Sequence, residues 1–365
     1  MTFRDRMNAV LHHQEPDRVP LAPYDDLVPR GSFERELRNR GMGLCLRRRW
    51  VWPETPNVRV EITTEGDVRK TTYHTPVGSV YTRLRTHISR EYGGSAELDG
   101  LIKGVEDFEP VIFMIEDTVY HVDSGPYLDA IRDVGEDGIV RVTAFESPPY
   151  DETLSLFGMS TSEGLANWSY ALQDYPDQFA RLLEALSSRA ERVLPLVADC
   201  PAEFVSLGSL DGFYGPKQFR SYVMPFYRRV TDALHSRGKI CSLHAHTPQL
   251  NNFAALIREA GFDVVEAFTP PPYGDLSISS ARAAWGEDMV VWVNFPETIF
   301  YSGFEATKQY TVDLLRSDAP GRSLVIGFTE MGLSGIVNDE VERIFKAGFF
   351  AIVEALEEYG AYPLT

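Results

Sequence analysis

Two histidines stand two residues apart, directly after a short apolar run. Residues 239–243 have the composition of a buried strand, and His244 and His246 follow it. In an extended chain, side chains at this spacing point to the same side, so both imidazoles can reach one metal ion. Imidazole is a borderline ligand that suits zinc. A hydrogen-bonded pair of polar residues is the alternative interpretation.

Carboxyl groups stand at or near the ends of other apolar runs. Glu330 follows residues 323–328, where it is a candidate third metal ligand or general acid–base group, and otherwise a solvated loop carboxylate. Asp211 follows residues 204–207. Glu266 lies inside an apolar run, where an unpaired carboxylate is costly, so we expect it to face a polar mouth or a wet strand end.

Strands and helices alternate through the second half of the chain. The predicted strands are residues 204–207, 239–243, 264–267, 289–293 and 323–328, and the helices that follow them are 216–237, 248–260, 277–285, 304–316 and 338–359. This alternation predicts parallel βαβ units, and the strand count favours a closed α/β fold, the (β/α)8 TIM-type barrel. Reactive groups in such a barrel lie at the carboxyl ends of its strands, so the polar residues above are expected to converge on one mouth.

The amino-terminal third follows a different pattern. Residues 3–11 have apolar side chains at helical spacing, and residues 58–90 predict an antiparallel β-hairpin. We therefore expect one barrel domain over residues 1–365, with an extension (1–103) of helix and hairpin before the main barrel (104–365).

Composition excludes several classes of partner. The chain has 365 residues, with 35 Lys+Arg against 53 Asp+Glu, so its net charge of −18 argues against nucleic acid and anionic membrane surfaces. No apolar run approaches the roughly 18 residues of a membrane span, and the first residues lack an apolar signal core. The 3 cysteines are too few and too scattered for a disulfide framework, so a cytoplasmic protein is expected.

One basic run interrupts this acidic composition. Arg47, Arg48 and Arg49 precede Trp50, and Trp52 follows nearby. Such a run suits binding of an anionic or aromatic ligand. The alternatives are a solvated basic turn, or a patch that answers the acidity of the chain.

The chain resembles the uroporphyrinogen decarboxylase superfamily, in particular its methyltransferase-like branch. The segments that carry the resemblance are residues 1–6, 15–20, 211–216, 222–226, 238–246, 260–263 and 358–360. It covers most of the chain, is strongest over residues 204–360, and implies a single distorted (β/α)8 barrel and a homodimer.

Two departures from the family pattern alter the expected chemistry. True uroporphyrinogen decarboxylases carry an Arg-Gln-Ala-Gly-Arg segment near the amino terminus, where this chain has Pro-Tyr-Asp-Asp-Leu-Val-Pro-Arg-Gly-Ser at residues 23–32, so tetrapyrrole decarboxylation is not expected. The family's zinc methyltransferases use His-x-Cys and a later Cys. The resemblance places His244, His246 and Glu330 at those positions, which implies a zinc site with nitrogen and oxygen ligands and no thiolate.

The resemblance implies a methyltransferase. Its methyl donor would be a small methoxy or methylamine-type compound, and the acceptor a cobalamin-type corrinoid on a separate protein, as in O-demethylation. A site without thiolate leaves more positive charge on the metal, which suits polarising an oxygen. The expected acid–base residues are Asp211, Glu266 and Glu330. The expected pocket residues are Tyr24, Tyr214, Phe268, Tyr273, Trp292, Asn294 and Phe295.

Two other functions remain open at this level. In a metal-independent decarboxylase or lyase of a small acid, His244 and His246 would bind the carboxylate, and Asp211 or Glu330 would donate the proton. In a barrel that binds a ligand without turnover, the same polar groups would serve recognition alone.

Overall fold

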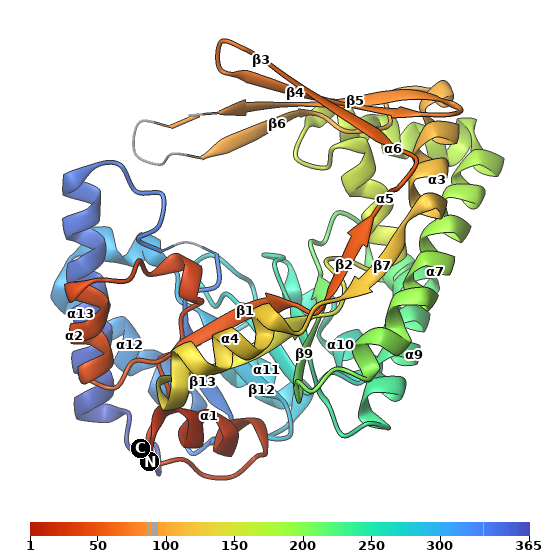
Figure 1. Ribbon diagram of the computed structural model, residues 1–365. Helices are drawn as coiled ribbons and strands as arrows, with labels where there is room; N and C mark the ends of the chain where they lie inside the picture. The colour runs from red at the N-terminus through yellow and green to blue at the C-terminus, as the bar shows by residue number, and fades with distance from the viewer. Residues whose placement is uncertain (87, 90–93, 331) are drawn as a thin grey trace. The chain divides into compact units, whose positions relative to one another are not determined.

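The computed structural model describes residues 1–86, 88–89, 94–330 and 332–365. The chain forms two compact units, whose elements are labelled in Figure 1. Unit 1 comprises Met1–Trp50, Ser124–Glu146 and Pro201–Thr365, and unit 2 comprises Val51–Asp123 and Ser147–Cys200. These boundaries differ from a division at residue 103, because the chain passes between the units at several points.

Unit 1 contains a parallel sheet of seven strands, in the order β1-β8-β9-β10-β11-β12-β13. The strands are β1 (Leu44–Arg49), β8 (Gly138–Thr143), β9 (Phe204–Ser209), β10 (Ile240–His244), β11 (Val264–Phe268), β12 (Val290–Asn294) and β13 (Leu324–Gly327). Helices cover the outside of this sheet and side chains fill its inside, so most strand residues are buried on both faces and their sequences are nearly continuous apolar runs.

An extended segment at residues 20–24 closes the sheet. The Ala22 N–H donates to the Ile326 carbonyl of β13 (2.7 Å), and the Cys45 N–H of β1 donates to the Pro23 carbonyl (2.9 Å). The segment bridges to both strands in parallel, so it takes the eighth position of the barrel. Proline has no backbone N–H to donate to a strand ladder, so this segment does not form a regular strand. Its sequence therefore lacks the periodic pattern that would predict a strand. The predicted (β/α)8 TIM-type fold is confirmed.

The helices of unit 1 surround the sheet (Figure 1). They are α1 (Phe3–Leu11), α2 (Ser32–Asn39), α4 (Gly125–Val134), α8 (Pro216–Gln218), α9 (Met224–His235), α10 (Ala254–Ala260), α11 (Ile278–Trp285), α12 (Phe304–Asp318) and α13 (Asp339–Tyr359). The helix expected over residues 216–237 is interrupted by a π-helical turn, Phe219–Val223. Pro225 cannot donate a helical hydrogen bond, and the wider turn before it accommodates this loss.

The core of unit 1 occupies the amino-terminal half of the barrel interior. Phe204 and Trp292 stack there, with ring centroids 6.2 Å apart. Met7 and Val10 of α1 belong to the same buried cluster, so this helix covers the amino-terminal end of the barrel. The opposite end is left for polar groups.

Unit 2 combines an antiparallel sheet with helices. The sheet order is β3 (Arg59–Glu65), β4 (Val68–Thr75), β5 (Gly78–Thr86) and β6 (Ser95–Asp99), and a separate ribbon pairs β2 (Val51–Glu54) with β7 (Val119–Val122). The helices are α3 (Phe108–Asp117), α5 (Pro149–Phe157), α6 (Ser162–Asp174) and α7 (Pro176–Ala198). The expected hairpin is therefore part of a larger sheet, and residues 87 and 90 of its predicted range lie outside the described residues.

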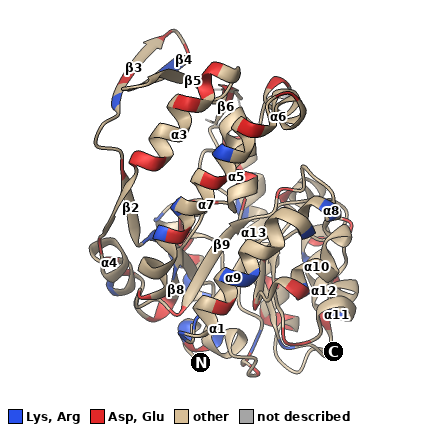
Figure 2. Ribbon diagram, turned by 90° about the vertical axis from the view of Figure 1, so that its right-hand side faces the viewer, with Lys and Arg blue, Asp and Glu red and all other residues tan. Residues whose placement is uncertain are grey.

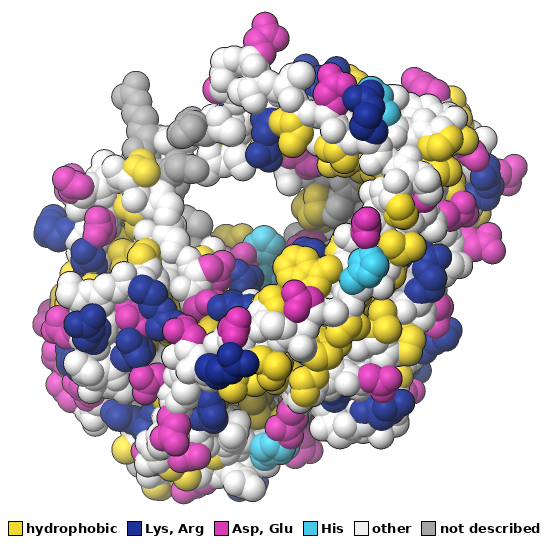
Figure 3. All heavy atoms as spheres, viewed as in Figure 1, with side chains coloured by type: hydrophobic (Ala, Val, Ile, Leu, Met, Phe, Trp, Pro, Cys, Tyr) yellow, Lys and Arg dark blue, Asp and Glu magenta, His cyan; other side chains and the backbone are white. Residues whose placement is uncertain are grey.

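Surface charges are interspersed. Figure 2 marks acidic and basic residues along the ribbon of both units. Figure 3 shows their side chains mixed on the face in view, in keeping with surface ion pairs such as Arg40–Glu357 and Arg220–Glu259. Exposed pairs of this kind contribute little to stability. Within the described part of the chain, no helix combines the length and the hydropathy that crossing a bilayer requires.

The ion pair between Arg6 and Asp17 predicts a pH-dependent contribution to stability. The buried Arg6 guanidinium lies 2.6 and 2.9 Å from the two Asp17 oxygens, and it lowers the pKa of Asp17 from 3.8 to about 2. A lowered folded-state pKa stabilises the protein above the ordinary pKa, and this stabilisation is lost as the pH falls towards 2. Asp17→Asn removes this ion pair and should therefore lower the free energy of unfolding at neutral pH. We expect a loss of only about 1–2 kcal/mol, because solvent screens the half-exposed carboxylate.

Urea unfolding between pH 7 and acid pH checks this prediction. The difference between wild type and Asp17→Asn should shrink below about pH 5. Asp129→Asn is the control, because Asp129 pairs with Arg132 on the surface and both side chains are 72% exposed. A difference for Asp17→Asn that is independent of pH would contradict the assignment.

Candidate active site

The carboxyl ends of β10 and β13 bring two imidazoles and a carboxylate together. His244 is the last residue of β10, and His246 lies two residues further on. Glu330 comes from the loop after β13. Its Oε1 lies 2.5 Å from His244 Nε2, and its Oε2 lies 3.5 Å from His246 Nε2. One carboxylate therefore contacts both histidines, whose ring centroids are 6.0 Å apart.

Asp211, after β9, adds a second carboxylate. Its Oδ1 lies 3.3 Å from His246 Nδ1, and its Oδ2 accepts a hydrogen bond from Ser209 Oγ (3.0 Å). The hydrogen bond to Asp211 raises the pKa of His246; burial opposes this rise, and the charges of Glu330 and Asp211 add to it. His246 is thus a partly exposed imidazole that carboxylates hold on two sides.

Gly212 allows this approach of Asp211 to His246. Its φ is +74°, and a Cβ at this position would lie 2.3 Å from Thr247 Oγ1. Only glycine fits both the left-handed conformation and the close contact between the two loops.

Glu266 of β11 is fully buried inside the barrel rather than exposed at its mouth. Its Oε2 accepts from the Tyr24 hydroxyl (2.7 Å), and its Oε1 accepts from Ser206 and Ser242 (3.0 Å each). The guanidinium of Arg141, from β8, lies 3.3 Å from Oε1. Burial acts to raise the pKa of Glu266, but the Arg141 charge and these hydrogen bonds hold it below its usual value, so the carboxylate is ionised.

Tyr24 connects this buried carboxylate to the mouth of the barrel. The Tyr24 hydroxyl donates its hydrogen bond to Glu266. Its oxygen is therefore left to accept a hydrogen bond from Arg141 (3.2 Å), and it faces His244 Nδ1 (3.4 Å). Burial, and then the charge of Glu266, raise the pKa of Tyr24 far above 10, so the phenol is neutral. An acceptor at Nδ1 favours the tautomer with its proton there, which leaves the lone pair on Nε2 towards Glu330.

The aromatic residues expected to line a pocket lie in several environments. Phe268 is fully buried and meets Trp285 of α11 edge-on (5.9 Å between centroids), so it packs outside the barrel. Tyr214 is buried and Tyr273 is 59% exposed. Trp292 packs inside the barrel beside Tyr24, and Phe295 packs against aromatic rings of the outer layer.

Asn294 braces the loops around the site. Its Oδ1 accepts from the Thr329 N–H (2.9 Å), next to Glu330, and its Nδ2 donates to Thr269 Oγ1 (3.2 Å). Both ends of the buried amide are therefore used to hold neighbouring loops. Asn294 therefore holds the residue that precedes Glu330.

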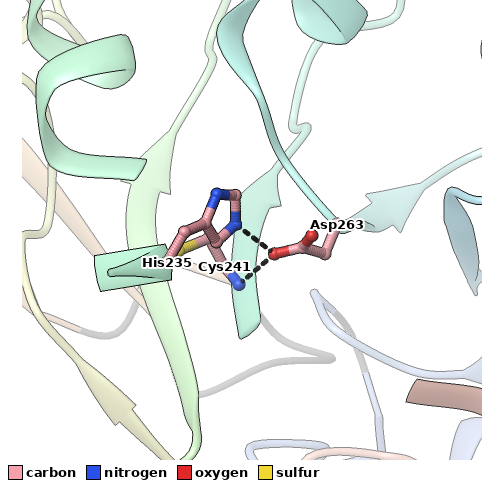
Figure 4. A group of neighbouring side chains, drawn as sticks. All are labelled: His235, Cys241 and Asp263. Atoms are coloured by element: carbon pink, nitrogen blue, oxygen red, sulfur yellow. Dashed lines mark hydrogen bonds and ion pairs between the residues drawn. The ribbon is translucent and has the colours of Figure 1, made fainter. Parts of the chain in front are cut away.

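A second group of metal-binding residue types lies at the amino-terminal end of β10. Figure 4 shows His235, Cys241 and Asp263, whose donor atoms lie within 4.8 Å of one another. Asp263 Oδ2 accepts from His235 Nε2 (2.8 Å) and from the Cys241 backbone N–H (2.7 Å). Burial strongly raises the pKa of the Cys241 thiol, which opposes formation of the thiolate that metals bind. The two hydrogen bonds to Asp263 link the end of α9 with β10.

Comparison with solved structures relates the fold to known proteins. A methyltransferase from Methanosarcina mazei aligns over 98% of this chain and 99% of its own, with 13% identity and a TM-score of 0.55. Two further matches have lower TM-scores. A B12-independent methionine synthase from Shewanella sp. W3-18-1 has 8% identity over 93% of this chain and 98% of its own (TM-score 0.42), and the endo-beta-1,4-mannanase from Thermotoga petrophila has 11% over 95% and 77% (TM-score 0.40).

Sequence comparison assigns the family. No curated protein matches the chain. Residues 100–329, which span most of the barrel, match the uroporphyrinogen decarboxylase (URO-D) family. Family membership supports an enzymatic role, in line with the polar cluster at the barrel mouth. The chain belongs to the uroporphyrinogen decarboxylase family.

Proposed function

We propose that this protein is a methyltransferase, which takes a methyl group from a small methoxy or methylamine-type compound and passes it to a corrinoid on a separate protein. The observation that carries the proposal is the convergence of His244, His246 and Glu330 at the carboxyl ends of β10 and β13. The fold shared with the Methanosarcina mazei methyltransferase agrees with it.

The residue types of this cluster are ones that bind zinc, which supports the proposed metal. Two imidazoles and a carboxylate are a ligand set that zinc enzymes use, with a further position open to substrate. Glu330 Oε1 is buried and has no hydrogen bond among the described residues, although it faces His244 Nε2 at 2.5 Å. A cation bound by both atoms would satisfy that oxygen. His244, His246 and Glu330 are therefore the residues that would hold the metal.

The chain's own residues position this chemistry. Glu266 and Tyr24 hold His244 with its Nε2 towards Glu330, and Asp211 holds His246 from the other side. When bound, zinc would supply a Lewis acid for the substrate oxygen, and the corrinoid partner would supply the methyl acceptor. A ligand set of nitrogen and oxygen suits a methoxy oxygen better than a soft thiol.

Methylation of a reduced corrinoid tests the proposal. Purified protein is mixed with a reduced corrinoid protein and a panel of methoxy and methylamine-type compounds, and the absorbance change of cobalt methylation is followed. Methylation that depends on both the protein and one class of donor is expected. Carbon dioxide release from small acids without corrinoid, and no methylation with any donor, would overturn the proposal.

A metal-independent decarboxylase is the second candidate. The raised pKa of His246 favours its cationic form, which binds a carboxylate, and the family takes its description from a decarboxylase. In this case Asp211 or Glu330 would donate the proton to the product. The carbon dioxide assay above separates the two candidates.

Removing the Tyr24 hydroxyl should impair the histidine cluster. Tyr24→Phe deletes the group that faces His244 Nδ1, so zinc affinity and kcat should each fall by about 10–100-fold. Tyr170→Phe is the matched control, because Tyr170 lies on α6 of unit 2 and is 64% exposed. Chelator competition measures the zinc affinity, and corrinoid methylation measures kcat. Circular dichroism first checks that each variant is folded. Equal zinc affinities for Tyr24→Phe and Tyr170→Phe would exclude this positioning role.

A further inference from the structure

The basic run of the sequence lines a cavity at the barrel mouth. Arg47, Arg48 and Arg49 are the last three residues of β1, not a turn. Together with Asp25, Asp26, Glu146 and Thr143 they line a cavity of about 290 Å³. Thr143 ends β8, the neighbour of β1, so the cavity opens at the carboxyl ends of two adjacent strands.

One side chain connects this cavity to the histidine cluster. The Arg47 guanidinium carbon lies 4.2 Å from the centre of the Tyr24 ring, in a cation–π contact. The hydroxyl of the same ring lies 3.4 Å from His244 Nδ1. A ligand bound at Arg47 would therefore lie one aromatic residue away from the candidate metal ligands.

The arginines have binding capacity beyond their present ion pairs. Each pair joins one terminal nitrogen to one oxygen: Arg47 to Asp26 (2.5 Å), Arg48 to Asp25 (3.0 Å) and Arg49 to Glu146 (2.7 Å). The other terminal nitrogen of Arg48 donates to the Arg47 carbonyl (2.7 Å). A guanidinium can instead present two parallel N–H groups to a carboxylate. The three arginine side chains are 29–49% exposed, and partly exposed single contacts are weak enough for a ligand carboxylate to replace them.

We propose that this cavity, the Arg47–Arg49 pocket, binds a carboxylate of the substrate, so that the methyl donor is an anionic compound. Three adjacent guanidinium groups repel one another unless acids neutralise them, which explains Asp25, Asp26 and Glu146 in the free protein. A substrate carboxylate adds the charge that these arginines attract and leaves the methyl-bearing end free for the neighbouring cluster. The inference rests on the proposed function, because it names the substrate class of the same site.

Binding of matched anionic and neutral probes tests the proposal without turnover. Calorimetry on the full chain compares 4-methoxybenzoate with 4-methoxybenzamide, and methoxyacetate with methoxyacetamide. At least one acid should bind about tenfold more tightly than its amide. This preference should disappear in Arg47→Gln and in Arg48→Gln. Arg59→Gln is the matched control, since Arg59 pairs with Glu61 on unit 2 and is 68% exposed.

The outcomes separate this inference from the proposed function. Acids and amides that bind alike in both pairs, or a preference that survives both arginine substitutions, would overturn the inference. Methylation of the corrinoid from neutral donors would then leave the proposed function standing. An arginine-dependent preference for acids without any corrinoid methylation would support the pocket and refute the methyltransferase.

Discussion

Replacement of Glu266 with alanine should lower the free energy of unfolding by about 3–5 kcal/mol, because it leaves the Arg141 charge buried without a partner. The Arg141 side chain is 4% exposed and Glu266 is fully buried. The substitution also removes the acceptor for the hydroxyls of Tyr24, Ser206 and Ser242, and each unsatisfied buried donor adds to the loss. Urea unfolding followed by circular dichroism measures the effect.

Two further variants make this prediction specific. Glu259→Ala is the control, since Glu259 pairs with Arg220 on the surface, and its stability should stay close to that of wild type. Glu266→Gln keeps one oxygen acceptor and should fall between wild type and Glu266→Ala. If Glu266→Ala were as stable as Glu259→Ala, the buried pair of Glu266 and Arg141 would not stabilise the barrel. That result would favour a purely catalytic role for Glu266.

Replacement of His244 with alanine should remove both the metal and the activity. We expect about one zinc per chain in protein purified without chelator, and almost none in His244→Ala. Loss of a Lewis acid costs several kcal/mol of transition-state stabilisation, so kcat/KM for corrinoid methylation should fall by at least about 100-fold. Elemental analysis and the methylation assay measure the two effects.

His235→Ala is the matched control for this experiment. His235 belongs to the hydrogen-bonded group with Cys241 and Asp263 at the other end of β10, so its loss should leave zinc content and activity unchanged. Zinc lost in His235→Ala but kept in His244→Ala would place the metal at that end of the strand. Full activity of His244→Ala would refute the role assigned to the mouth cluster.

The sequence was most informative where strands are apolar and regular. The buried strands β9 to β13 are short apolar runs bounded by polar residues, and the rule that reactive groups follow the strands then led to His244, His246, Asp211 and Glu330. The structure brings these four side chains together.

Irregular backbone explains what the sequence could not predict. Alternation along a strand would place Glu266 and Phe268 on the same side. The register of β11 against β12 shifts between Val265 and Phe268, and Ala267 has a φ of +57°. Such a bulge changes the side to which the following side chain points, so Glu266 faces the barrel interior while Phe268 packs against α11.

Charge and proline hid two other parts of the barrel. The three arginines of β1 made a strand end resemble a solvated turn, although Leu44 to Leu46 are fully buried. The closing segment at residues 20–24 contains two prolines and forms no regular strand, so it gave no periodic signal. Tyr24 therefore could be named as a candidate, but not as the link between Glu266 and His244.

The closing segment also sets an order of events during synthesis. Residues 20–24 leave the ribosome before every strand of the sheet, yet one of their two pairing partners is β13, the last strand of the barrel. Until β13 emerges, residues 20–24 can pair with β1 but not with β13. The incomplete sheet then has unpaired strand edges, which can associate with other chains. Tyr24 takes its final place only then, so a nascent chain that stops short of β13 carries His244 without the hydroxyl that orients it.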